Sequence, residues 1–169
     1  MSGIAPNFVI VTLGVSDLDR SIAFYSALGW EMRGRRADGI VWFRTSGCWV
    51  GLFPDHELAT DAGLTPGDLP AFRAITLAVN LPSEEEVDAA FESWTAAGGS
   101  LVKPATRMDW GGYSGYVADP DGHLWELCFN PGFPLDEHGR IDIGRGRAEP
   151  HLRALALAPL PRRRPPRPR

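Results

Sequence analysis

Glu126 is the residue of this sequence best placed to do chemistry, because it stands three residues after His123 in a segment rich in glycine and aromatic residues. The segment, DWGGYSGYVADPDGHLWELCFNP, runs from residue 109 to residue 131. A carboxylate and an imidazole are common ligands of divalent metal ions and also common general acids and bases. The two side chains could therefore form one wall of a metal site, or only a hairpin that carries a carboxylate.

The spacing argues against joint metal binding by His123 and Glu126. Side chains at odd separations along a strand point to opposite faces, so the sequence predicts that His123 is a structural turn residue bonded to the backbone of its own turn, residues 119–122. The other histidines and the cysteines have no second ligand or base at a useful spacing: His56, His138, His151, Cys48 and Cys128. We expect surface histidines and inert thiols, with no metal and no cofactor.

Charge is distributed unevenly along the chain. The formal net charge is −4, but from Gly144 on eight arginines face one acid, Glu149, which makes that segment +7. Subtracting +7 from −4 leaves −11 for the preceding body. An acidic body argues against a nucleic-acid partner on the folded part. Two cysteines outside any CxxC pair, and the lack of a secretory or membrane-spanning apolar run, predict a cytoplasmic protein without a membrane partner.

Two stretches of the chain follow one plan and predict a repeated module. VTLGVSDLDRSIAFYSALGW (11–30) and ITLAVNLPSEEEVDAAFESWTAAGG (75–99) each run from an apolar strand pattern through polar capping residues into a helix that ends at glycine. Ser16 or Asp17 is suited to cap the first helix, and Ser83 begins a capping box at the second.

After each helix the apolar pattern switches to period two, which predicts three further strands in each half. The expected strands are 31–35, 40–44 and 48–53 in the first half, and 100–103, 113–118 and 124–129 in the second.

The expected fold class is therefore α+β, with two repeated βαβββ modules that form a curved mixed sheet around a cleft. The modules cover residues 8–54 and 72–130, and a connector at 55–71 joins them within one domain, 1–143. The Arg/Pro-rich tail, 144–169, is too poor in buriable residues to fold, and we expect it to be disordered.

The opening VSDLDRSIAFY, the repeated half and the closing YVADPDGHLWEL together resemble the vicinal oxygen chelate superfamily. This group holds glyoxalase I, extradiol dioxygenases, fosfomycin-resistance enzymes, methylmalonyl-CoA epimerase and bleomycin-resistance proteins. The resemblance covers about residues 8–134. It implies a homodimer with a small-molecule ligand, and in the bleomycin-resistance branch the binding cavities lie between two subunits.

The resemblance also points to four positions at which metal-using members carry ligands, one on the first and one on the last strand of each half. In this sequence these positions fall on Ile10, near Gly51, on Ala74 and on Glu126. Zinc and iron sites need at least three side-chain donors, and only Glu126 is one. The resemblance therefore implies a cleft without a metal.

Alternation predicts that the face shared with Glu126 is mostly small or apolar, with one carboxylate and two hydroxyls, as in small-molecule pockets. Trp110 is expected on a glycine-hinged loop near the mouth of the cleft, where it could stack on a planar, aromatic ligand. Ordinary packing is the alternative for Trp110 and for Tyr113, and a scaffold role is the alternative for Glu126. The predicted ligand-binding residues are Thr12, Trp49, Thr76, Trp110, Tyr113, Leu124 and Glu126, of which Glu126 is also the candidate catalytic residue.

Three functions remain open from the sequence. The favoured one is a metal-independent protein that binds or sequesters a small molecule. The second is an enzyme of the lyase, isomerase or dioxygenase type that works through Glu126. The third is an interaction protein whose basic tail is the active part.

Overall fold

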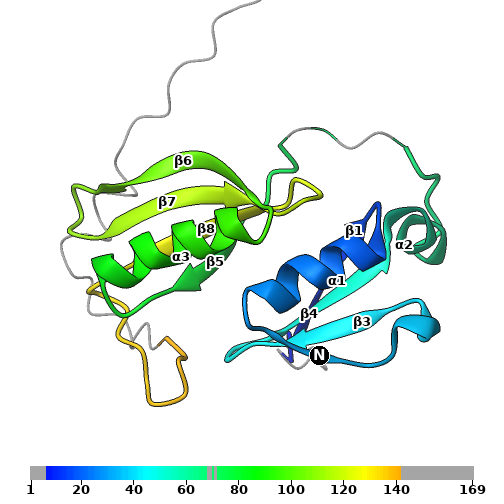
Figure 1. The fold of residues 1–169 in the computed structure, drawn as a ribbon, viewed down its shortest axis with the longest axis horizontal. Helices are drawn as coiled ribbons and strands as arrows, with labels where there is room; N and C mark the ends of the chain where they lie inside the picture. Colours follow the sequence, from blue (N-terminus) through cyan, green and yellow to red (C-terminus); the bar gives the residue numbers. More distant parts are fainter. Residues whose placement is uncertain (1–6, 68–69, 71, 142–169) are drawn as a thin grey trace, which may run out of the picture.

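The first half of the chain folds as a four-stranded sheet with one long helix against it (Figure 1). The computed structural model describes residues 7–67, 70 and 72–141. β1 (Ile10–Val15) leads into α1 (Leu18–Ala27), which is followed by β2 (Glu31–Arg33), β3 (Val41–Arg44) and β4 (Trp49–Pro54). The strand order is β1-β4-β3-β2, with β1 parallel to β4 and the other pairs antiparallel.

The second half repeats this arrangement. It consists of β5 (Leu77–Asn80), α3 (Glu84–Ala96), β6 (Ser100–Arg107), β7 (Tyr113–Ala118) and β8 (Leu124–Phe129), in the sheet order β5-β8-β7-β6. The prediction of an α+β fold with two βαβββ modules is confirmed. The domain boundary at residue 143 and the tail, 144–169, lie outside the described residues.

Local sequence signals explain where the two long helices begin and end. Asp17 caps α1 by accepting hydrogen bonds from the backbone N–H groups two and three residues later, at 3.0 and 3.1 Å. Ser83 caps α3 by accepting from the N–H of Glu86 at 3.2 Å. Each helix is followed by a glycine in the left-handed region, with φ of 81° at Gly29 and 103° at Gly98.

The strand predicted at 100–103 is longer than expected, because β6 continues to Arg107. Two further elements were not predicted from the sequence. The predicted connector at 55–71 contains a helix, α2 (Asp55–Asp61), whose first turn carries Asp55 and Glu57 at the positive end of its dipole. A single 3-10 turn, Arg36–Asp38, also lies between β2 and β3. None of the helices in the described ranges combines the length and apolarity needed to span a bilayer.

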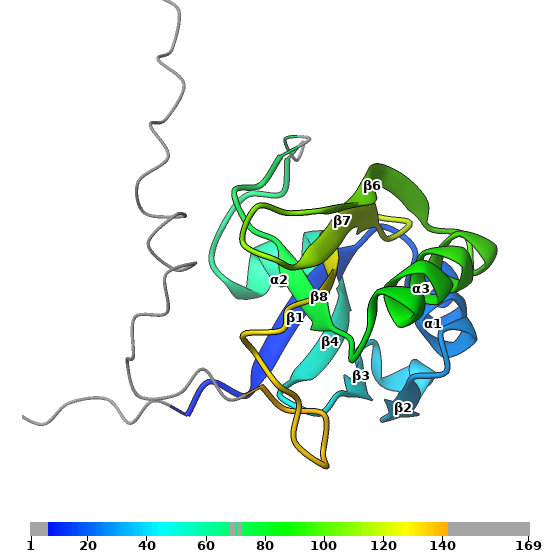
Figure 2. The ribbon, with the colours of Figure 1, turned by 90° about the vertical axis from the view of Figure 1, so that its left-hand side faces the viewer.

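The two modules share one core through their helix-bearing sides. Figure 2 shows α1 and α3 next to each other on one side of the molecule. The rings of Phe24 on α1 and Trp94 on α3 meet edge to face, with centroids 5.1 Å apart, and Trp30 meets Trp125 in the same way at 5.5 Å. Because the core lies between the helix-bearing sides, the opposite face of each sheet stays outside it.

Candidate ligand-binding site

The turn before β8 joins the two modules through polar contacts. One carboxylate oxygen of Asp121 accepts hydrogen bonds from the backbone N–H of Ser16 at 2.8 Å, from its hydroxyl at 2.7 Å, and from Arg20 at 2.7 Å. The other oxygen accepts from the Ser21 hydroxyl at 2.6 Å. Burial acts to raise the pKa of Asp121, but these hydrogen bonds and the charge of Arg20 outweigh it and lower the pKa.

Asp119, at the start of the same turn, anchors it in the core. Asp119 is only 3% exposed, and one of its carboxylate oxygens accepts a hydrogen bond from the Tyr25 hydroxyl at 2.7 Å. The other oxygen accepts from the backbone N–H groups of Asp121 at 3.0 Å and His123 at 2.9 Å. Burial first, and the negative charge of Asp119 second, raise the pKa of Tyr25 well above its usual value. These contacts make the DPDG turn a structural joint.

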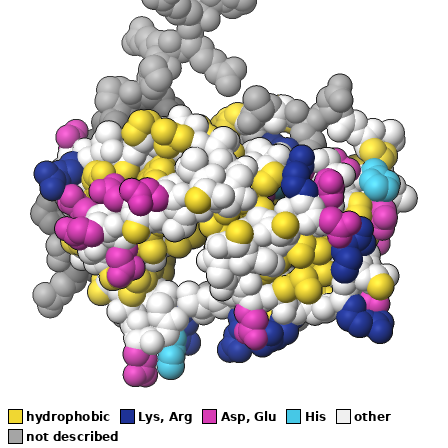
Figure 3. Space-filling model, viewed as in Figure 1, with side chains coloured by type: hydrophobic (Ala, Val, Ile, Leu, Met, Phe, Trp, Pro, Cys, Tyr) yellow, Lys and Arg dark blue, Asp and Glu magenta, His cyan; other side chains and the backbone are white. Residues whose placement is uncertain are grey.

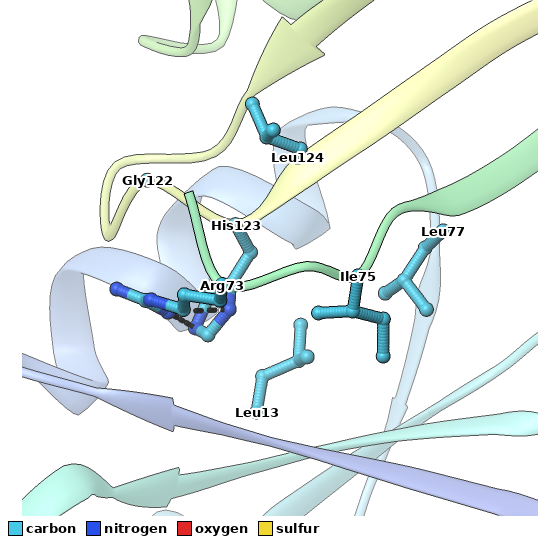
Figure 4. Close-up of a pocket in the computed structure, with 7 residues that line it drawn as sticks. All are labelled: Leu13, Arg73, Ile75, Leu77, Gly122, His123 and Leu124. Carbon is cyan, nitrogen blue, oxygen red and sulfur yellow. Dashed lines mark hydrogen bonds between the residues drawn. The ribbon is translucent and has the colours of Figure 1, made fainter. Parts of the chain in front are cut away.

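His123 belongs to this joint rather than to a metal site. Its Nε2 lies 2.8 Å from the carbonyl oxygen of Gly14 in the first module, and its Nδ1 lies 2.8 Å from the guanidinium of Arg73 (Figure 4). Because Arg73 can only donate and the carbonyl can only accept, the imidazole holds its proton on Nε2. The predicted structural role fits these contacts, although the ring bonds to Gly14 and Arg73 and not to the turn backbone.

Glu126 lies on the face of the second sheet that points away from α3. It pairs directly with Tyr116 on β7 and with Ala78 on β5. Burial first, and the charge of Glu126 second, raise the pKa of Tyr116 and raise that of Cys128 to about 11. The Cys128 thiol therefore stays protonated at neutral pH, as expected for an inert thiol.

On the corresponding face of the first sheet, Gly51 is buried between its neighbours. Gly51 pairs with Thr12 on β1 and with Trp42 on β3. A methyl group added to Gly51 would lie 3.1 Å from the Thr12 hydroxyl oxygen and 3.4 Å from the Trp42 indole nitrogen. Trp49, two residues earlier, pairs with Ile10 at the beginning of β1. Trp42 was not among the residues predicted from the sequence, although the alternation of β3 places it on this face.

The predicted ligand-binding residues fall into separate groups. Thr12 and Trp49 lie on the first sheet, and Leu124 and Glu126 on the second. In the described part of the chain, no hydrogen bond or ion pair joins Glu126 to Thr12. Thr76 lines a cavity of about 640 Å³ between the modules, whose walls include the indoles of Trp30 and Trp125.

Tyr113 and Trp110 lie elsewhere. The Tyr113 hydroxyl donates a hydrogen bond to Asp88 on α3 at 2.8 Å, so its ring lies on the helix-bearing side of β7, opposite to Tyr116. That hydrogen bond is the main cause that raises the pKa of Tyr113. The Trp110 ring folds over Gly112 in its own hairpin, where any side chain at Gly112 would collide with it. For these two residues the packing alternative describes the contacts.

The family model of the Glyoxalase/Bleomycin resistance protein/Dioxygenase superfamily matches residues 7–127. The chain belongs to this superfamily. The superfamily was the one suggested by the sequence motifs, so that resemblance is confirmed.

Solved structures of superfamily members agree with this assignment. A glyoxalase-related enzyme from Fulvimarina pelagi is 34% identical, with a TM-score of 0.73 over 82% of this chain and 98% of that chain. A glyoxalase/bleomycin resistance protein/dioxygenase from Nocardioides is 26% identical, with a TM-score of 0.63 over 76% and 85%. Lactoylglutathione lyase from Agrobacterium tumefaciens, 24% identical with a TM-score of 0.58 over 75% and 96%, shares the fold.

The residues at the superfamily's metal-ligand positions do not fit a divalent ion. Ala74 has φ of 57° and precedes β5, so it lies outside the strand. Gly14 pairs with Phe53, as its repeat equivalent Ala78 pairs with Glu126. The counterpart of Glu126 is therefore Phe53 rather than Gly51. Neither Phe53 nor Gly51 has a side-chain atom that could bind a metal ion. Among the described residues, no group of three or more His, Cys, Asp or Glu side chains is arranged to hold a metal ion.

Proposed function

We propose that this superfamily member is a metal-independent protein that binds or sequesters a small molecule on the open faces of its sheets. The feature that supports the proposal is the outer face of the first sheet, where the partly exposed side chains of Thr12 and Trp42 lie on either side of the buried Gly51. A flat wall beside a hydrogen-bonding group suits a planar, aromatic ligand.

Glu126 supplies the charged group of the proposed site. It is half-buried beside Tyr116, and Ala78 on the neighbouring strand leaves space next to it. Without a metal to bind, its carboxylate accepts a hydrogen bond or pairs with a cationic group of the ligand. The second-sheet site residues, Leu124 and Glu126, would then fix the orientation of a ligand that the first sheet holds by stacking.

A second copy of the chain would bring the two faces together, so we propose a homodimer with the cavity between subunits. Both β1 and β5 are edge strands of their sheets. Apolar side chains are exposed at the start of each strand, with Phe8 76%, Ile10 44% and Ile75 56% exposed. Unpaired strand edges and exposed apolar residues are features of surfaces that associate.

An enzyme that uses Glu126 is the second candidate, with lyase, isomerase or dioxygenase chemistry. The observation that favours it is the pairing of Glu126 with Tyr116. Burial first, and the charge of the carboxylate second, raise the pKa of Tyr116, so its side chain stays a neutral phenol at pH 7. A carboxylate that takes a proton and a neutral phenol that gives one back could act on the same substrate. We also propose a cytoplasmic location, because Cys48 and Cys128 are both free thiols.

A thermal-shift screen of the full chain tests the proposal. The library contains aromatic antibiotics, α-keto acids and thiol conjugates, each with divalent ions and with chelator. We expect a compound that raises Tm equally in both conditions, because no step of binding requires a metal. A rise in Tm that appears only with added metal would contradict the proposal. Chemical conversion of the bound compound would contradict the sequestering function.

Variants then locate the compound. Gly51→Leu would displace the Thr12 hydroxyl and the Trp42 indole and should weaken binding at least about tenfold, whereas Gly67→Leu, where nothing lies within 4 Å of an added side chain, should not change it. Glu126→Gln should weaken the binding of a cationic compound. Glu57→Gln, the same change on α2, is the matched control. Equal affinity in Gly51→Leu and the unmodified chain would place the ligand elsewhere.

A further inference from the structure

A groove runs between α3 and β6 on the helix-bearing side of the second module, away from Glu126. Its volume is about 670 Å³, and its walls are mainly apolar or aromatic, from Phe91, Leu101, Pro104 and Tyr113. Leu101 is 54% exposed, which is high for a leucine on a strand. Asp88 and Glu92 border the groove along the helix.

The helix that forms one wall is strongly acidic. α3 contains no lysine or arginine, and its acidic residues are Glu84, Glu85, Glu86, Asp88 and Glu92. Figure 3 shows acidic side chains gathered over α3 at the left of the molecule. In the part of the chain that the structure describes, the only ion pair of this group joins Glu84 to Arg107, at 2.9 Å. The groove is therefore apolar inside and negatively charged along one border.

The chain itself contains a segment with complementary chemistry. Residues 159–169 read PLPRRRPPRPR, with five prolines and five arginines. Proline-rich segments favour the extended polyproline II conformation and bind aromatic-lined grooves at a low entropic cost. Arginine next to such prolines pairs with carboxylates at the border of the groove.

We propose that the groove between α3 and β6 binds the chain's own arginine- and proline-rich segment, residues 159–169. The prolines lie against Tyr113, Pro104 and Leu101, and the arginines pair with Asp88 and Glu92. This surface is separate from the open sheet faces, so the segment leaves the proposed ligand site free.

The intervening chain, fully extended, exceeds the width of a compact domain of this size. Seventeen residues, 142–158, separate Ile141 from Pro159. A flexible chain of that length has an r.m.s. span of about 23 Å, and fully extended it reaches about 60 Å. Tethering gives the segment an effective concentration of about 1 mM at the groove. If the segment binds with a dissociation constant of about 0.5 mM, it occupies the groove in two thirds of the molecules.

Hydrogen exchange of the full chain tests the proposal. The comparison is with a chain of equal length in which the five arginines of 159–169 are replaced by serine. Amides of residues 88–105 should exchange about threefold more slowly in the unmodified chain, as expected for a site two thirds occupied. The difference should disappear at about 1 M NaCl, where charges are screened within about 3 Å. Equal exchange in the two chains at low salt would overturn the proposal.

Matched variants separate the groove from general electrostatics. Glu92→Lys should abolish the protection of 88–105, whereas Glu57→Lys, the same change on α2, should leave it intact. Leu101→Ser, at an exposed position, should reduce it. Protection that persists in Glu92→Lys overturns the assignment to this groove. Protection that is lost on hundredfold dilution assigns the segment to a second copy and overturns the intrachain contact.

Discussion

In the first module the turn before the last strand is Thr45-Ser46-Gly47, whereas in the second it is Asp119-Pro120-Asp121-Gly122. The hydrogen bonds of the first turn are mainly internal and join the Thr45 hydroxyl to the backbone of Cys48. The second turn reaches α1 of the other module through both of its aspartates. The comparison shows that equivalent turns of the repeat have different tasks, one closing a hairpin and the other joining the modules.

The strands that face the proposed ligand differ as well. β1 has six residues and begins at Ile10, while β5 has four and begins only at Leu77. On the last strands, Phe53 in the first module corresponds to Glu126 in the second. In the proposed site the first module therefore contributes aromatic walls and a hydroxyl group, and the second contributes the charge.

The largest effect should come from breaking the joint at Asp119. Asp119→Ala leaves the buried Tyr25 hydroxyl without its acceptor and removes two turn hydrogen bonds, so the free energy of unfolding should fall by about 3 kcal/mol. Thr45→Ala in the first-module turn should lower it by about 1 kcal/mol. Urea denaturation measures both, and equal losses would contradict the different tasks of the two turns.

The next largest effect should be a difference in stability between alanine substitutions of glycines on the two faces of the sheets. A methyl group on Gly115 would lie 2.6 Å from backbone atoms of Lys103 and Ala105 and 2.7 Å from Phe91, so Gly115→Ala should cost about 2 kcal/mol of stability. Gly51→Ala meets the Thr12 hydroxyl oxygen at 3.1 Å, a side-chain atom that can shift, and should cost about 1 kcal/mol. Thermal denaturation compares them, and an equal loss of stability in the two variants would contradict this difference.

Asp121 should give the joint a dependence on pH. Because its folded-state pKa is lowered from 3.8, its stabilising contribution is present above the unfolded pKa and is lost as pH falls through the folded pKa. Asp121→Asn should lower the free energy of unfolding at pH 7 by about 1 kcal/mol. It should also flatten the decline in stability as the pH falls below the unfolded-state pKa of 3.8. An unchanged slope in acid would show that Asp121 does not carry this dependence.

Most of the fold could be predicted from the sequence because its signals are local. Asp17, Ser83 and the glycines after each helix fix the helix ends, and alternation fixes the strands. The helix α2 was missed because seven residues within a Pro- and Gly-containing connector give too short a pattern to identify.

The site could be predicted only in part. Alternation places Thr12 and Glu126 on open faces, but it cannot show that β7 turns Tyr113 toward Asp88 on α3. Nor could it show that Asp121 and His123 contact the first module, since these contacts join residues about a hundred positions apart. The positive φ of Ala74 likewise could not be predicted, because alanine rarely adopts this conformation and no local signal marks it.

The superfamily's ligand positions in this chain hold one donor, and we propose that they bind no metal. Metal analysis of the full chain, purified without added metal, measures this directly. We expect less than about 0.1 equivalent of zinc, nickel, iron or manganese per chain, because a single carboxylate does not hold such an ion against dilution. One equivalent that is lost in Glu126→Gln but kept in Glu57→Gln would contradict it.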